Sequence, residues 1–123
     1  MTSVALVSIV DDDESLRKAL DNLIRSMGWE VLSFESAEAF LDSGAACRTQ
    51  CLISDVTMPG MSGIEMHARL ISQGIAPPTI FITGYPTAQD KTLALANGAL
   101  AYVEKPVDSN VLMSTVQKVI STP

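Results

Sequence analysis

Short apolar runs alternate along the chain with segments whose apolar residues recur every three or four positions. The runs are rich in β-branched residues and have the length of buried strands, which predicts strands at 4–10, 30–34, 51–55, 79–83 and 100–104. The intervening segments have helical periodicity, which predicts helices at 14–27, 36–44, 62–73, 87–97 and 108–120.

Several expected helices carry residues that favour a helix end. Ser62 and Glu65 have the spacing of a capping box, Ser36 and Asp108 are expected N-caps, and Gly28 is expected to end the first helix. Five βα units in a row, with no repeat and no linker, predict an α/β fold with a doubly wound parallel sheet. We expect one domain over residues 1–123.

Composition narrows the possible functions. Hydrophobic residues make up 47% of the chain, and eight basic against fourteen acidic residues give a net charge of −6. Without a basic run, direct nucleic-acid binding is not expected, whereas a divalent cation or a basic partner surface suits the acidic balance. No apolar run has transmembrane length and no positive segment precedes the first one, so we expect no membrane span, no secretory signal and a cytoplasmic location.

The two cysteines, Cys47 and Cys51, have the spacing of half a zinc site. A single histidine, His67, and no second cysteine pair leave that site incomplete, so reduced thiols are expected. We expect His67 on the surface of its helix and Trp29 in the packing between the first helix and the second strand.

Chemically distinctive residues stand where the predicted strands end: Asp11 and Asp12 after the first, Asp55 at the third, Thr83 at the fourth and Lys105 after the fifth. In a doubly wound sheet these ends lie along one edge, where ligands bind, so the side chains should converge. Two carboxylates about 4 Å apart repel by roughly 4 kcal/mol at an effective dielectric of 20. A hard cation relieves such repulsion, and Mg²⁺ prefers oxygen ligands.

The acidic run continues through Asp13 and Glu14. Asp13 is expected to be a helix N-cap or a solvated acid, and Glu14 a first-turn charge that complements the helix dipole. In the stretch 58–63, Gly60 and Gly63 are expected to supply backbone freedom.

Four stretches, "IVDDDESLRKAL", "LISDVTMPGMSGIE", "FITG" and "YVEKP", resemble in order and separation the motifs of the receiver domain of two-component response regulators. The resemblance covers essentially the whole chain and is strongest to the nitrogen-fixation, LuxR-type branch. It implies a flavodoxin-like (βα)5 fold with strand order 2-1-3-4-5. It also implies a signalling switch, not an enzyme in the usual sense, whose phosphoryl donor is a sensor histidine kinase.

The resemblance also implies roles for individual residues. Asp55 would be the phosphoryl acceptor, and Asp11, Asp12, Asp55 and the backbone carbonyl of Thr57 would hold Mg²⁺. Lys105 would pair with Asp55 at rest and with a phosphoryl oxygen afterwards.

The same resemblance implies a switch. Thr83 would move to hydrogen-bond the phosphoryl group, Tyr102 would rotate inward, and the Lys105-Pro106 peptide would be cis. The face of helix four, strand five and helix five, about 87–120, would then rearrange and bind a downstream protein, an output domain or a second copy. Resemblance to this branch favours an output domain outside this chain, whereas the length of the chain, 123 residues, favours a stand-alone regulator. Of the two, we slightly favour the stand-alone regulator.

Tyr85 and Pro86 depart from the residues that related receivers carry after "TG". A bulky side chain at this point is expected to affect the dephosphorylation rate, because it can control the access of water to the phosphoryl group.

Two alternatives compete with a phosphorylated receiver. "IVDDDES" also fits the opening motif of haloacid-dehalogenase-type phosphatases, with Asp11 as nucleophile and Asp13 as acid/base. The chain is short for such an enzyme with a cap, and that interpretation leaves Asp55 without a role. A receiver that no longer takes phosphate is the other alternative, against which stand the intact Asp55, Thr83 and Lys105.

Overall fold

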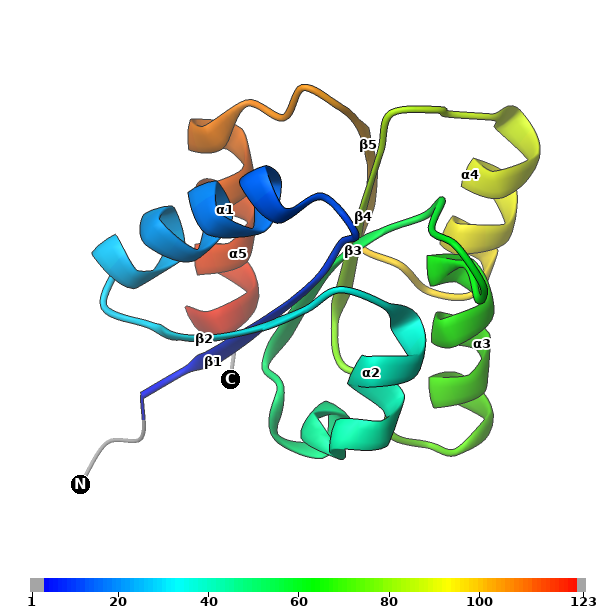
Figure 1. The fold of residues 1–123 in the computed structure, drawn as a ribbon, viewed down its shortest axis with the longest axis horizontal. Helices are drawn as coiled ribbons and strands as arrows, with labels where there is room; N and C mark the ends of the chain where they lie inside the picture. Colours follow the sequence, from blue (N-terminus) through cyan, green and yellow to red (C-terminus); the bar gives the residue numbers. More distant parts are fainter. Residues whose placement is uncertain (1–3, 122–123) are drawn as a thin grey trace.

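Five parallel strands form one central sheet in the computed structural model, which describes residues 4–121 (Figure 1). The strands are β1 Leu6–Val10, β2 Glu30–Phe34, β3 Cys51–Asp55, β4 Thr79–Thr83 and β5 Ala101–Glu104. Their order is β2-β1-β3-β4-β5, as expected. In the register of the central strands, Ile53 pairs with Ile9 on one side and with Ile80 on the other.

Five α-helices cover the two faces of this sheet. They are α1 Glu14–Ser26, α2 Ala37–Ser43, α3 Gly63–Ser72, α4 Ala88–Ala96 and α5 Ser109–Ser121, and a short 3-10 helix, η1 Ala45–Arg48, follows α2. Helices α1 and α5 lie on one face, and α2, α3 and α4 lie on the other (Figure 1). The expected helices are confirmed with ends that differ by at most one residue, whereas η1 was not predicted.

The capping residues explain where the helices begin. Ser62 accepts a hydrogen bond from the Glu65 backbone N–H at 3.1 Å, and the Glu65 carboxylate accepts one from the Ser62 N–H at 3.3 Å, which completes the capping box. Asp13 caps α1 by accepting from the Leu16 N–H. Asp108 caps α5 through the N–H groups of Asn110 and Val111. These contacts satisfy backbone donors that the first helical turn leaves unpaired.

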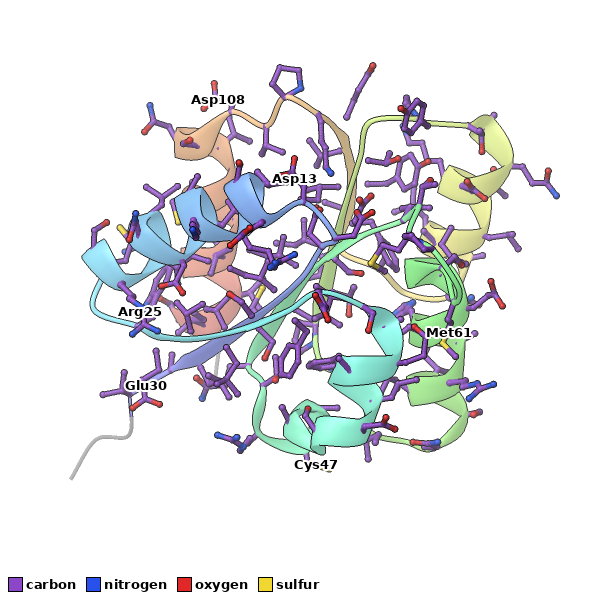
Figure 2. The ribbon with its side chains drawn as sticks, in the orientation of Figure 1. Asp13, Arg25, Glu30, Cys47, Met61 and Asp108 are labelled. Carbon is purple, nitrogen blue, oxygen red and sulfur yellow. The ribbon has the colours of Figure 1, made fainter. Side chains whose placement is uncertain are left out.

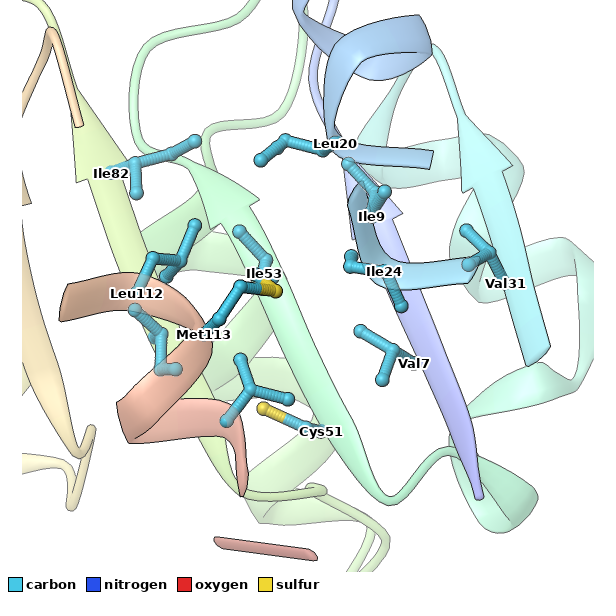
Figure 3. Packing of buried hydrophobic residues seen from close by; sticks show 12 residues of the cluster. Val7, Ile9, Leu20, Ile24, Val31, Cys51, Ile53, Ile82, Leu112 and Met113 are labelled. Carbon is cyan, nitrogen blue, oxygen red and sulfur yellow. The ribbon is translucent and has the colours of Figure 1, made fainter. Parts of the chain in front are cut away.

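The larger core cluster lies between the sheet and the α1–α5 layer (Figure 3). Leu20 and Ile24 of α1 pack over β1 and β2, and Leu112 and Met113 of α5 pack over β3 and β4. All residues of β1, β3 and β4 are buried because helices cover both faces, which explains why these strands are continuous apolar runs. Trp29 packs against this cluster, as expected.

Helix α4 is held to the sheet by much less apolar burial. Ala94 is the one buried residue among 88–96, and it belongs to a small cluster with Phe81 of β4. Leu93 and Leu95 are 46% and 44% exposed. An element with so little buried surface costs little free energy to displace.

The expectation that His67 lies on the surface is wrong. Its side chain is only 3% exposed and meets the Phe81 ring edge-to-face at 5.4 Å. Burial lowers the pKa of His67, and its Nδ1 has no hydrogen-bond partner among residues 4–121. The cause is helical phase, because Met66, His67 and Leu70 form the buried stripe of α3.

Within the described residues, no helix is both long enough and apolar enough to cross a bilayer.

Candidate functional site

The carboxyl ends of the strands bring the expected side chains to one edge of the sheet. Figure 2 shows Asp13, just after β1, and Asp108, after β5, at this end of the molecule, and Cys47 at the opposite end. Cys47 is an exposed free thiol and Cys51 a buried one. Neither cysteine is part of the site.

Lys105 joins two of the acids. Its Nζ donates to Asp11 Oδ2 at 3.0 Å and to Asp55 Oδ2 at 3.2 Å. Asp11 is fully buried and Asp55 is 5% exposed, so both carboxylates are largely removed from water. Residues that are 94 and 50 positions apart in sequence are thus held around one ammonium group. The peptide between Lys105 and Pro106 is cis.

Asp55 stands at the end of β3 with both carboxylate oxygens engaged. Oδ1 accepts from the Thr57 backbone N–H at 3.2 Å and Oδ2 accepts from Lys105. Burial raises the pKa of Asp55, the charge of Asp11 raises it further, and Lys105 and the Thr57 N–H oppose the rise. The balance leaves a carboxylate whose negative charge is only partly compensated.

Lys105 remains a cation in this setting. Burial works to lower its pKa, but the hydrogen bond and charge of Asp11, together with those of Asp55, outweigh burial and raise the pKa. An ammonium group is therefore available to attract a further anion at the same place.

The arrangement of donor atoms fits a hard divalent cation. Asp11, Asp12 and Asp55 each offer a carboxylate oxygen, and these oxygens lie within 4.8 Å of one another. Oxygen atoms on opposite sides of Mg²⁺ are about 4.2 Å apart, twice its usual bond length, so small adjustments or bridging waters suffice. Three carboxylates and one ammonium give −3 + 1 = −2, which one divalent cation balances.

An open cavity of about 650 Å³ leads to these groups. Its lining includes Asp12, Asp55, Thr57, Tyr85 and Lys105. Thr57 is exposed, and the Tyr85 side chain is 76% exposed at the rim. Asp55 can therefore be reached from solvent through this cavity, and Tyr85 is part of its lining.

Thr83 and Tyr102 are connected through the loop that leads into α4. The buried Thr83 hydroxyl accepts from the Tyr85 N–H at 3.0 Å, and the hydroxyl of half-buried Tyr102 accepts from the Thr87 N–H at 3.2 Å. Thr87 is in turn the N-cap of α4. The four residues from Gly84 to Thr87 are thus held at two points, one hydroxyl at each end.

Gly63 has a role that the sequence did not reveal. Its φ is not positive, so the expectation of backbone freedom is wrong there, whereas Gly60 does have a φ of 79°. A Cβ on Gly63 would lie 2.1 Å from the Asp55 carbonyl oxygen and 2.9 Å from the Ser54 Oγ. The start of α3 therefore approaches the backbone of Asp55 more closely than any side chain permits.

Two further contacts near the site were not predicted. Glu38 of α2 accepts a hydrogen bond from the Met61 N–H at 3.2 Å and so secures the loop after β3. Arg17 of α1 donates to the backbone carbonyl of Asp11 at 2.6 Å. Each contact pairs a side chain with a backbone group, a kind of partner that residue types along a sequence do not indicate.

Asp13 and Glu14 have the positions expected for a helix start. Glu14 lies in the first turn of α1 and forms an exposed ion pair with Lys18. Asp13 caps the helix, so its carboxylate is committed to a backbone donor. This use of Asp13 disfavours the phosphatase alternative, which needs that carboxylate as acid/base.

Comparison with known proteins agrees with this geometry. Residues 7–117 match the family model described as response regulator receiver domain. Nodulation protein W of Bradyrhizobium diazoefficiens is 39% identical over 112 residues, which cover 91% of this chain and 49% of that protein. The transcriptional regulatory protein FixJ of the same organism is 33% identical over 120 residues, covering 98% of this chain and 58% of that protein. The chain thus spans about half the length of these relatives.

Solved structures show the same arrangement. The crystal structure of FixJ-N superposes with a TM-score of 0.86 at 33% identity, covering 99% of this chain and 98% of that one. A response regulator receiver protein from Burkholderia phymatum gives a TM-score of 0.80 at 39% identity, covering 97% of each chain. The chain belongs to the response regulator receiver domain family, in the nitrogen-fixation branch that includes FixJ.

Proposed function

We propose that Asp55 accepts a phosphoryl group from a sensor histidine kinase in a Mg²⁺-dependent reaction and that the product is the active signalling state. The observation that carries this proposal is the bridge from Lys105 to both Asp11 and Asp55 at the open cavity. It combines a nucleophilic carboxylate, a fixed cation and a neighbouring acid in one solvent-accessible place. The chain acts as one receiver domain over residues 1–123, and we place the reaction in the cytoplasm.

The transfer requires one bond to form and one to break. A carboxylate oxygen of Asp55 attacks the phosphorus of a phosphohistidine, the new O–P bond forms, and the P–N bond breaks with its electron pair going to the imidazole, which takes up a proton. Catalysis consists mainly of positioning and of neutralising charge on the equatorial oxygens. Lys105 is placed to exchange its contact with Asp55 for one with a phosphoryl oxygen.

Asp11, Asp12 and Asp55 would hold Mg²⁺, with the backbone carbonyl of Thr57 as a further ligand. When bound, Mg²⁺ supplies positive charge beside the transferred group and removes the repulsion among the three carboxylates. The buried Asp11 is fixed by its neighbours, whereas the exposed Asp12 completes the set from the solvent side.

The acceptor can be identified at the peptide level. After reaction with acetyl phosphate and Mg²⁺, borohydride reduces an acyl phosphate to an alcohol, which marks the modified residue permanently. Peptide mass spectrometry should then find the mark at Asp55. A mark at Asp11 or Asp12 would reject the assignment and favour the phosphatase alternative.

Phosphorylation is proposed to switch the face formed by α4, β5 and α5. If Thr83 turns its hydroxyl towards the phosphoryl group, the loop from Gly84 to Thr87 loses its hold at Tyr85, and the contact between Thr87 and Tyr102 must adjust. Helix α4 then follows, because its N-cap is Thr87 and its own burial is slight. Tyr102 is free to rotate inward as that loop shifts.

The same face offers apolar surface for a partner. Leu95 of α4, Leu100 just before β5 and Val111 of α5 are 44%, 49% and 60% exposed. A second copy of the chain, a downstream protein or an output domain outside this chain is the proposed occupant.

Backbone amide spectra test the switch. Addition of beryllofluoride and Mg²⁺ is expected to shift the resonances of residues 83–104 far more than those of α2. Equal small shifts throughout the chain would show that the α4–β5–α5 face does not respond.

A further inference from the structure

Asp11 is held at four points in the structure. Its N–H donates to the Phe34 carbonyl, Oδ1 accepts from the Asp13 N–H, and Oδ2 accepts from Lys105. The fourth contact is the hydrogen bond from Arg17 Nη1 to the Asp11 backbone carbonyl at 2.6 Å. Two of these contacts act on Asp11 itself, the bond from the Asp13 N–H spans Asp12, and the bond from Arg17 acts on the peptide that leads to Asp12.

The contact from Arg17 restrains the peptide through which the chain leaves the strand towards Asp12. A peptide unit is planar, so fixing the carbonyl oxygen of Asp11 fixes the plane that also contains the Cα of Asp12. Asp12 is exposed, unlike buried Asp11 and Asp55. Its carboxylate therefore depends on the backbone for its position relative to the other two.

The charge of Arg17 alone would have the opposite effect. Arg17 lies beside Glu14, Lys18 and Asp21 in a shallow hollow of α1 and β2, close to the acidic run. None of the ion pairs found among residues 4–121 includes Arg17. Coulomb repulsion predicts that removing this cation raises the affinity for Mg²⁺, whereas removing a positioning contact lowers it. The two effects differ in sign.

We infer that Arg17 is a positioning residue for the metal site: by binding the Asp11 carbonyl, it presents Asp12 to Mg²⁺. The inference rests on the proposed Mg²⁺ site. Partners that orient metal ligands typically contribute about tenfold or more to metal affinity. We therefore expect an Arg17→Met variant to bind Mg²⁺ about tenfold more weakly.

Isothermal titration of Mg²⁺ into wild type, Arg17→Met and Arg17→Lys measures this effect. Methionine keeps an unbranched side chain of similar helix propensity but removes the donor and the charge. Lysine keeps a cationic donor and should recover part of the affinity. Arg25→Met is the matched control, because Arg25 lies on the same helix and donates to the Val31 carbonyl, far from the acidic run (Figure 2).

A second readout separates positioning from general damage. The rate of phosphorylation by acetyl phosphate should require more Mg²⁺ for half-maximal effect in Arg17→Met, and should return to the wild-type value at saturating Mg²⁺. Urea unfolding without Mg²⁺ reports any loss of stability. A purely structural role would lower stability and leave the Mg²⁺ affinity unchanged.

The possible outcomes are distinct. Weaker binding in Arg17→Met, partial recovery in Arg17→Lys and unchanged binding in Arg25→Met support the inference. Equal or tighter binding in Arg17→Met, with wild type still binding Mg²⁺, overturns the inference and leaves the proposed function standing. If wild type binds no Mg²⁺, the proposed metal site is itself wrong and the inference falls with it.

Discussion

Replacing Gly63 with alanine should slow phosphorylation at the site although Gly63 is not one of the reacting residues. The new Cβ would stand 2.1 Å from the Asp55 carbonyl oxygen, whereas ordinary contacts begin at 3.4 Å. The two atoms must therefore move apart by more than about 1 Å. The opposing atom belongs to the backbone, which cannot swing aside as a side chain can. The start of α3 and the end of β3 must therefore separate, and Asp55 moves with its own carbonyl.

Two magnitudes set the expected result. Overpacking of this kind costs about 1–3 kcal/mol, and alanine at the first position of a helix returns less than the roughly 0.5–1 kcal/mol that it returns in a helix interior. A displacement of 1 Å at reacting groups can cost about a hundredfold in rate. We expect Gly63→Ala to remain folded at 25 °C and to be phosphorylated by acetyl phosphate about a hundredfold more slowly.

Gly28→Ala is the matched control for this experiment. Gly28 has a φ of 87° and nothing within 4 Å of its Cβ position, so alanine there strains the backbone without touching Asp55. It should lose about 1 kcal/mol or more of stability and keep the wild-type rate. The rate is followed by intact mass, and stability by urea unfolding. Wild-type phosphorylation in Gly63→Ala would show that the close approach to Asp55 has no catalytic consequence.

Three further variants test other parts of the account. Burial raises the pKa of Asp55 above its ordinary 3.8, so the ionised carboxylate destabilises the fold at neutral pH. Asp55→Asn should therefore unfold at higher urea than wild type at pH 7 without Mg²⁺, and a lower midpoint would contradict this. Burial lowers the pKa of His67 below 6.5, so the unfolded chain binds more protons and stability falls as pH drops below that value. His67→Leu should weaken this pH dependence and, by removing an unpaired buried nitrogen, raise the free energy of unfolding by about 1–3 kcal/mol. Urea midpoints equal to those of wild type at both about pH 5 and about pH 8 would contradict this prediction. Tyr85→Ala should shorten the lifetime of the phosphorylated protein, measured by intact mass over time, because the ring no longer covers the cavity; an equal lifetime would exclude gating.

Local sequence signals predicted most of the fold. The apolar runs of β1, β3 and β4 are unbroken because both faces of the sheet are covered, and the Ser62–Glu65 pair marked the start of α3. Parallel topology then placed Asp11, Asp55 and Lys105 along one edge of the sheet, since each stands at or just after the end of a strand. These inferences depended on residue type and spacing alone.

The sequence was less informative about residues whose role depends on contacts between distant segments of the chain. His67 lies on a stripe with Met66 and Leu70, and that spacing could have revealed its burial. No comparable signal exists for Arg17, whose partner is a backbone carbonyl, or for Gly63, whose constraint comes from the close approach of another segment. Such contacts appear only once the chain is folded.

The most direct test of the central claim is the intact mass of wild type, Asp55→Asn and Asp11→Asn after incubation with acetyl phosphate and Mg²⁺. We predict that wild type gains one phosphoryl group, that Asp55→Asn gains none, and that Asp11→Asn gains it more slowly at limiting Mg²⁺. An adduct that persists in Asp55→Asn and disappears in Asp11→Asn would identify Asp11, just after β1, as the nucleophile and contradict the account.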